Sequence, residues 1–258
     1  PNLIANAMSG KPVHQWYPDA KKWAKVYEML SCFEGILELY RVNGEPQLLE
    51  SVKRFYQGLK QSEYNLLFGV GFNDIFANGA AQLNAITEPC DVIHWMRLAY
   101  ELHLETGEKS YLDDFEMAFY NPFLAAVYRD GKWGARGVRS HGRHLTALEQ
   151  AGFTRNHCCV NNIPRGFMNM VQTSLTVQGN TVSVNLFTES EGDIELADGG
   201  KIKLSISGNY LAAGEVRIVY EAMPQGEINL RVRIPGWAKA TCIELDGKRF
   251  AVGGEWFQ

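Results

Sequence analysis

The apolar residues of this 258-residue chain change their spacing once, near residue 178, and this change limits the folds that the chain can adopt. Between about residues 19 and 177 they recur every three or four positions, which is typical of amphipathic helices. From about residue 181 onward they alternate with polar residues, which is typical of strands with one buried face. The sequence predicts a mixed α and β chain with a helical domain over residues 1–178 and a β-domain over residues 179–258.

Five helices are expected in the first domain, over residues 23–40, 48–59, 90–104, 111–128 and 164–177. Asn43-Gly44, Thr106-Gly107 and Asp130-Gly131 supply stop signals, because glycine adopts the left-handed conformation that often ends a helix. Short connections between long helices indicate helical hairpins stacked as in an α/α toroid.

Short alternating segments are expected to form an antiparallel β-sandwich in the second domain. They lie at residues 182–186, 202–206, 216–220 and 230–234, and turn signals such as Asp198-Gly199-Gly200 and Asp246-Gly247 separate them. The chain ends in what reads as the start of another strand, and it begins without an initiator methionine. We therefore expect a piece of a longer protein with an incomplete β-domain.

The charge and apolar content exclude two classes of partner. The net charge is −4, so no basic field attracts nucleic acid or anionic lipid. No apolar run approaches the roughly 20 residues that a membrane helix needs. We expect neither nucleic acid nor a membrane as partner, whereas the compartment and a possible homo-oligomer stay open.

The five cysteines do not suggest a disulfide framework, because their number is odd and their spacing irregular. Cys32 and Cys242 are expected to pack as small hydrophobic residues. Cys158 and Cys159 are adjacent, and a disulfide between neighbours strains the bond geometry. With Glu88 and Cys90 they offer three sulfurs and one oxygen, a donor set that suits tetrahedral zinc.

Several segments resemble glycoside hydrolase family 127, the β-L-arabinofuranosidases and their relatives. They are residues 30–40, Thr87-Glu88-Pro89-Cys90, residues 111–121, residues 158–165 and residues 230–237. The resemblance covers nearly the whole chain and implies a partial (α/α)6 barrel, without its first helices, followed by the β-sandwich. It also implies a retaining glycosidase that uses a zinc-bound cysteine thiolate on β-L-arabinofuranosides or related glycosides.

Roles for individual residues follow from the same resemblance. Cys158 corresponds to the nucleophile, and Glu88, Cys90 and Cys159 to its zinc partners. Glu116 matches a glutamate of the active site that holds substrate hydroxyls or supports the thiolate. Where the family carries its acid and base, a glutamate, this chain has Asp74 in the segment before Glu88.

Three further residues are candidates for substrate binding. His157 directly precedes the cysteine pair, where it can line the pocket or donate a hydrogen bond to a metal ligand. Arg143 and His144 lie in an expected loop, from which Arg143 can hold sugar hydroxyls. Their spacing alone defines no ligand geometry.

Other functions compete with the glycosidase. One is a non-catalytic, zinc-stabilised carbohydrate-binding protein or degenerate hydrolase, favoured if Asp74 lies far from the zinc ligands. Another is a redox-responsive thiol protein, favoured if the cysteines bind no metal and oxidise readily. The carboxyl group and the nucleophile of a retaining enzyme lie about 5–5.5 Å apart, so the position of Asp74 separates these alternatives.

Overall fold

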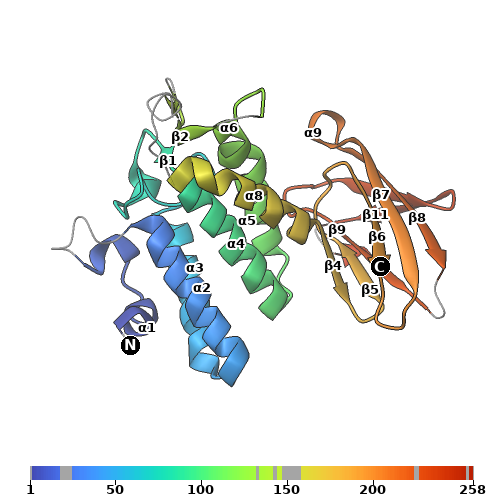
Figure 1. Ribbon diagram of the computed structural model, residues 1–258, viewed down its shortest axis with the longest axis horizontal. Helices are drawn as coiled ribbons and strands as arrows, with labels where there is room; N and C mark the ends of the chain where they lie inside the picture. The colour runs from blue at the N-terminus through green and yellow to red at the C-terminus, as the bar shows by residue number, and fades with distance from the viewer. Residues whose placement is uncertain are drawn as a thin grey trace. The chain divides into compact units, whose positions relative to one another are not determined.

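The computed structural model describes residues 2–17, 25–131, 134–141, 144–146, 158–223, 227–253 and 256–257. The chain divides into two compact units, Pro1–Asn169 and Met170–Gln258. Helices dominate the first unit and strands the second, as the change in apolar spacing predicts (Figure 1). None of the described helices is long and apolar enough to cross a membrane.

Helices of very different length build most of the first unit. The helices are α1 (Asn2–Met8), α2 (Val26–Asn43), α3 (Pro46–Ser62), α4 (Pro89–Thr106), α5 (Ser110–Ala118), α6 (Leu124–Ala126) and α8 (Cys158–Ser174), with the 3-10 turns η1 (Val13–Gln15) and η2 (Gly79–Ala81) and the π-helical segment η3 (Phe119–Phe123). Gly44 ends α2 and Gly107 ends α4, both in the left-handed conformation. Figure 1 shows α2 beside α3. Closure of the helices into a toroid stays a prediction.

The predicted fourth helix differs from the observed one. Instead of a continuous α-helix over residues 111–128, α5 passes into η3 and then into α6. Pro122 lies inside η3. Because proline has no backbone N–H to donate, it breaks the regular hydrogen-bond ladder, which explains the local widening to a π-helix.

Stacked aromatic rings form the centre of the helical unit. Phe33 on α2 stacks on Phe55 of α3, with ring centroids 3.7 Å apart. Tyr56 stacks on Trp95 of α4 at 4.0 Å and meets Tyr111 of α5 edge to face. All five side chains are fully buried, so this core fixes the relative positions of α2, α3, α4 and α5.

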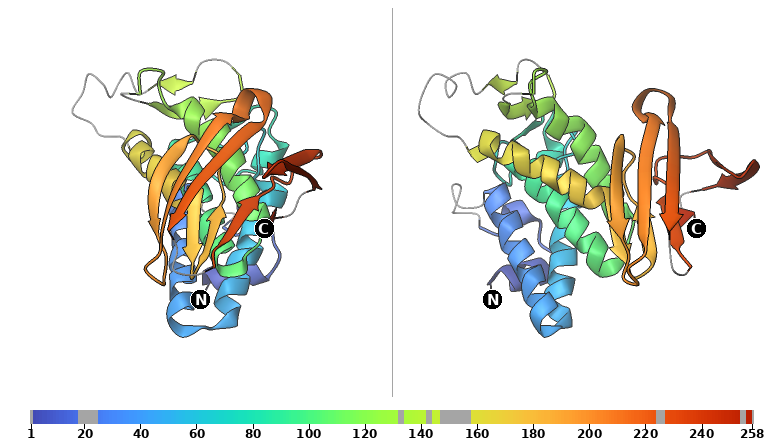
Figure 2. Two further views of the ribbon diagram at one scale, coloured as in Figure 1. Left: turned by 90° about the vertical axis from the view of Figure 1, so that its right-hand side faces the viewer. Right: turned by 45° about the vertical axis from the view of Figure 1, so that its right-hand side comes forward.

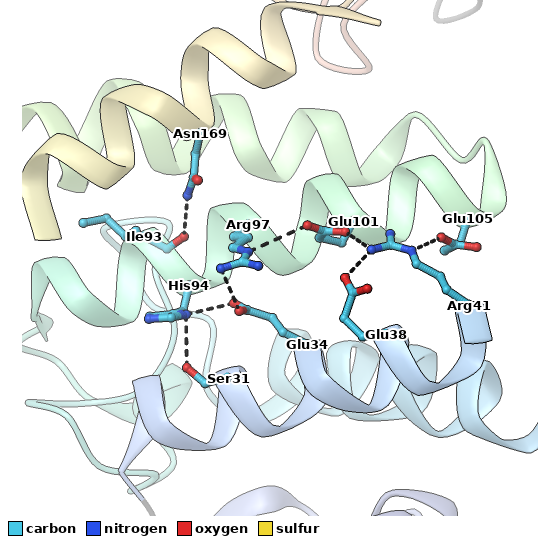
Figure 3. Close-up of polar contacts among 10 residues, drawn as sticks. All are labelled: Ser31, Glu34, Glu38, Arg41, Ile93, His94, Arg97, Glu101, Glu105 and Asn169. Carbon is cyan, nitrogen blue, oxygen red and sulfur yellow. Dashed lines mark hydrogen bonds and ion pairs between the residues drawn. The ribbon is translucent and has the colours of Figure 1, made fainter. Parts of the chain in front are cut away.

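A ladder of ion pairs joins the outer faces of α2 and α4 (Figure 3). Arg41 Nη1 lies 2.6 Å from Glu101 and Arg41 Nε 2.5 Å from Glu105. Arg97 on α4 reaches back to Glu34 on α2 at 3.5 Å. A network of this kind holds the two helices in register better than isolated surface pairs do.

A small antiparallel sheet lies beside the start of α4. Its strands are β1 (Ile86–Thr87), β2 (Ala135–Arg139) and β3 (Leu145–Thr146), in the order β1-β2-β3. Strand β1 leads directly into Glu88, the residue that caps α4. This sheet therefore fixes the point at which the chain enters α4.

The second unit contains two sheets and a hairpin, drawn from yellow to red in Figure 2. One sheet has the order β12-β9-β5-β4, the other β6-β7-β8, and β10 pairs with β11. The strands are β4 (Leu175–Gln178), β5 (Thr181–Val184), β6 (Ser190–Glu195), β7 (Lys201–Asn209), β8 (Glu215–Met223), β9 (Asn229–Arg233), β10 (Thr241–Leu245), β11 (Lys248–Val252) and β12 (Trp256–Phe257), with a short helix α9 (Tyr210–Ala213) before β8.

One apolar core draws on strands of both sheets, among them Val182 and Val184 of β5 and Ile202 and Leu204 of β7. The purely antiparallel pairing that the sequence predicts is wrong in one place, because β5 and β9 pair in parallel. Their connection passes through the whole β6-β7-β8 sheet, and a crossover of that length permits parallel pairing. Packing of the two sheets as a sandwich stays a prediction.

Cys32 and Cys242 are exposed, so the prediction that they pack in the core is wrong. Cys32 falls on the outer side of α2, whose buried residues include Leu30, Phe33 and Leu37. Neither cysteine lies in the cluster formed by the other three, which makes them natural controls for the experiments below.

We expect Asp114→Ala to lower the free energy of unfolding by about 3–5 kcal/mol, because it leaves a partly buried ammonium group without its partner. Lys60 Nζ lies 2.7 and 2.8 Å from the two Asp114 oxygens, and Tyr56 Oη donates to the same carboxylate at 2.8 Å. Urea unfolding measures the change. As a control, Glu50→Ala removes a half-exposed pair with Arg54, and we expect a loss below about 0.5 kcal/mol. Equal losses in the two variants would contradict this account.

Candidate metal centre and active site

Three cysteine sulfurs from two helices meet in the first unit. Cys90 is the second residue of α4, and Cys158 and Cys159 are the first residues of α8. The three sulfurs lie within 4.8 Å of one another. Helix α8 is held against α4 further along, where Asn169 donates to the Ile93 carbonyl at 3.2 Å (Figure 3).

Cys90, Cys158 and Cys159 are called the thiol cluster below. Glu88 contacts this cluster through Cys159. Its Oε2 accepts a hydrogen bond from the Cys159 sulfur at 3.0 Å. Glu88 also caps α4: its side chain accepts the Asp91 N–H, and Asp91 Oδ2 accepts the Glu88 N–H at 3.4 Å. The capping box thus fixes the direction of the Glu88 carboxylate.

The donor set fits a zinc ion. In a tetrahedral site with Zn–S bonds of about 2.3 Å, neighbouring sulfurs lie about 3.8 Å apart. The sulfurs of Cys158 and Cys159 are 4.0 Å apart, and all five cysteines are free of disulfides. Cys90, Cys158 and Cys159 can therefore hold a metal ion together. Glu88, the fourth ligand expected from the sequence, contacts only Cys159 of the three.

The protons of the metal-free cluster are shared unequally. The hydrogen bond from Cys159 lowers the pKa of Cys90 to about 7 against the effect of burial, with help from Asn162 and Cys158. The bond to Cys90 and burial raise the pKa of Cys159. Partial burial and the charge of Cys90 raise the pKa of Cys158. Near neutral pH the thiolate therefore resides on Cys90, where the start of α4 also favours a negative charge.

Access separates the three sulfurs. Cys90 and Cys159 are buried, whereas Cys158 is exposed. Only an exposed sulfur can reach the anomeric carbon of a bound sugar. Among the three, Cys158 is thus the most accessible to a bound molecule.

Asp74 lies in a tightly structured loop before β1. The buried Glu63 organises this loop by accepting the N–H groups of Asn78 at 3.1 Å and Gly79 at 2.8 Å. Asn73 and Asp74 both have positive φ angles, 51° and 63°, which non-glycine residues rarely adopt. The loop thus holds Asp74 in one defined orientation.

Asp74 is only 6% exposed, and its Oδ2 lies 2.5 Å from Lys25 Nζ. The hydrogen bond and charge of Asp74 raise the pKa of Lys25, so the ion pair persists. Burial and the charge of Asp74 raise the pKa of Asp91 well above its usual range. Asp74 is therefore a neighbour of the α4 start, but one of its oxygens is occupied by lysine.

The other predicted substrate-binding residues differ in their positions. Glu116 is buried on α5, only 2% exposed. His144 is half-buried beside the β2–β3 turn, and its Nδ1 accepts the Arg139 N–H at 3.2 Å. Arg143 and His157 lie outside the described residues.

Sequence reasoning missed Asn162. Its Nδ2 donates to the Cys90 sulfur at 3.1 Å. The available signal was helical spacing, because Asn162 follows Cys158 and Cys159 by four and three residues and so shares their face of α8.

Comparisons with known families place both parts of the chain in one family. Residues 19–172 match the family model of the β-L-arabinofuranosidase GH127 catalytic domain, and residues 181–255 match that of the GH127 middle domain. Among curated protein sequences, none matches significantly.

Solved structures share the fold. A GH127 β-L-arabinofuranosidase from Geobacillus stearothermophilus T6 matches 95% of this chain with a TM-score of 0.71 and 18% identity. The GH127 β-arabinofuranosidase BT3674 matches 98% with a TM-score of 0.75 and 18% identity. A third structure, described as a glycoside hydrolase, matches 90% with a TM-score of 0.73 and 18% identity. The chain spans 44% of the length of each of these proteins.

We expect Asn162→Ala to raise the pKa of Cys90, because it removes a donor to the thiolate. Starting from about 7, the first midpoint should rise by roughly half a pH unit in reduced, metal-free protein. Ultraviolet thiolate absorbance against pH measures it. Asn161→Ala is the matched control, since Asn161 is exposed one residue earlier on α8, and its midpoint should equal that of the wild type. An unchanged midpoint in Asn162→Ala would contradict the assigned contact.

Proposed function

We propose a function from the premise that this chain belongs to the GH127 β-L-arabinofuranosidase family: it is a retaining glycoside hydrolase. Its proposed substrates are β-L-arabinofuranosides or related glycosides, and its proposed cofactor is zinc. The observation that carries the proposal is the thiol cluster, with three sulfurs within 4.8 Å of one another and Glu88 bonded to Cys159.

Cys158 acts as the nucleophile in this proposal. Its exposure supports the role, because its sulfur is accessible while those of Cys90 and Cys159 are buried. Glu88, Cys90 and Cys159 would hold the zinc with Cys158. The bound ion supplies charge that keeps the sulfurs ionised at neutral pH.

The chain's own residues perform the remaining steps. The Cys158 sulfur attacks the anomeric carbon, and a carboxylic acid protonates the departing oxygen. Water then attacks the same carbon from the leaving-group side and releases Cys158. Glu116 is proposed to hold substrate hydroxyls, together with His144, Arg143 and His157. Family position favours Asp74 as the acid, although it is buried against Lys25.

A non-catalytic, zinc-stabilised carbohydrate-binding protein is the second candidate. The ion pair of Asp74 with Lys25 favours it, because an acid that serves a substrate must reach the glycosidic oxygen. A redox-responsive thiol protein is supported only by the closeness of the three sulfurs, and stable zinc binding would exclude it.

We expect about one zinc per chain in the freshly reduced wild type and a loss of that zinc in Cys90→Ala, measured by elemental analysis. The zinc-loaded wild type should hydrolyse aryl β-L-arabinofuranosides, and Cys158→Ala should lower turnover by about a thousandfold or more. Cys32→Ala and Cys242→Ala are matched controls that should keep both zinc and turnover. Wild-type protein without zinc would contradict the proposal, and zinc without turnover would favour the binding protein.

A further inference from the structure

The proposed reaction needs a carboxylic acid that can reach both the leaving group and a water molecule. Asp74 is poorly suited, since it is only 6% exposed and one oxygen lies on Lys25. The following inference rests on the proposed function. It concerns a second carboxylate, which lies in the first turn of α2.

Glu28 is an exposed residue at the start of α2, and the hydroxyl of its neighbour Tyr27 holds it. Tyr27 Oη donates to Glu28 Oε1 at 3.0 Å. The bond gives an otherwise free surface carboxylate a defined position.

Tyr27 lies close to the thiol cluster. Burial, the bond to Glu28, the charge of Glu28 and the charge of Cys158 together raise the pKa of Tyr27 to about 12. The phenol therefore has two acidic neighbours, Glu28 and Cys158. Both of these neighbours are exposed, so they can share a solvent-accessible surface.

Ring contacts give the same location independently. The rings of Tyr27 and His94 lie 6.2 Å apart and are tilted by 35°. His94 follows Cys90 by one helical turn on α4, so both side chains occupy the same face. The Cys90 sulfur in turn lies within 4.8 Å of that of Cys158.

The support under Tyr27 is rigid. His94 is buried, and its Nδ1 lies 2.8 Å from Glu34 Oε1 and 3.2 Å from Ser31 Oγ (Figure 3). Lys25 Nζ lies 5.7 Å from the centre of the Tyr27 ring. The phenol is thus fixed from both sides, and its hydrogen bond to Glu28 fixes the position of that carboxylate.

We propose that Glu28 is the catalytic acid and base of this reaction and that Tyr27 is its positioning residue. In the first step the Glu28 carboxyl group gives its proton to the glycosidic oxygen while the bond from that oxygen to the anomeric carbon breaks. A bond forms from the Cys158 sulfur to the same carbon. In the second step the Glu28 carboxylate takes a proton from water, the water oxygen bonds to the carbon, and the carbon–sulfur electron pair returns to Cys158.

A simpler role for Glu28 predicts different results. Carboxylates in the first turn of a helix stabilise it through the helix dipole. In that case Glu28→Gln would lower stability slightly and would affect all substrates equally.

The first test needs no substrate. In metal-free, reduced protein we expect Glu28→Gln to speed alkylation of Cys158 by iodoacetamide about 2- to 3-fold, because removing a nearby negative charge favours the thiolate. Tandem mass spectrometry distinguishes Cys158 from Cys159. Glu38→Gln, about 15 Å further along α2, is the matched control and should leave the rate unchanged. An unchanged rate in Glu28→Gln would overturn the placement beside Cys158.

The second test uses zinc-loaded protein and aryl β-L-arabinofuranosides with leaving groups of different acidity. Glu28→Gln should lower kcat/KM by about 10²–10⁴ for the least acidic leaving groups and far less for a dinitrophenyl glycoside, which needs no proton. Added azide should restore turnover of the activated substrate by replacing water. Tyr27→Phe should lower kcat about 10-fold with the same leaving-group trend and little change in KM.

The Asp74→Asn variant tests whether Asp74, rather than Glu28, is the catalytic acid. We expect it to lower activity equally for all leaving groups, as a loss of loop structure does. The leaving-group trend in Asp74→Asn, with none in Glu28→Gln, would overturn the inference and leave the proposed function intact. A zinc-loaded wild type that hydrolyses none of the substrates would overturn both, whatever the alkylation rates.

Discussion

The candidate site depends on the way in which α4 begins. Glu88 directly follows β1 and caps α4, and its carboxylate accepts hydrogen bonds from both the Asp91 N–H and the Cys159 sulfur. One side chain thereby connects a helix terminus to a helix that starts about 70 residues later in the sequence. Cys90 follows two residues later, so its sulfur inherits the same fixed position.

Local rules explain how much of this the sequence could predict. The helical period and the Asn43-Gly44 and Thr106-Gly107 stops predicted α2 and α4, because these helices bury one apolar face and end in left-handed glycines. The convergence of Cys90, Cys158 and Cys159 was predicted from donor chemistry, and their sulfurs do meet. Residues that are suited to bind the same metal can thus be grouped from the sequence before their positions are known.

The failures have a common physical origin in contacts between distant segments. Lys25 and Asp74 are 49 residues apart, and no local sequence pattern indicates that they form an ion pair. Tyr27 and Glu28 look like ordinary residues of a first helical turn, and only the contact of Tyr27 with His94 of α4 draws attention to them. The parallel pairing of β5 with β9 likewise depends on a crossover, which the alternating pattern does not encode.

The pKa values of the three thiols determine how many protons a metal ion must displace when it binds. With its pKa lowered to about 7, Cys90 is partly ionised near neutral pH, whereas raised pKa values keep Cys158 and Cys159 protonated. A zinc ion that takes all three sulfurs must therefore displace protons from Cys158 and Cys159, and acid weakens its binding. In the proposed reaction, the proton that leaves Cys158 is the one whose loss would create the nucleophile. Metal binding and activation of the exposed sulfur would then be one event, because hydrogen bonds already lower the pKa of the buried Cys90.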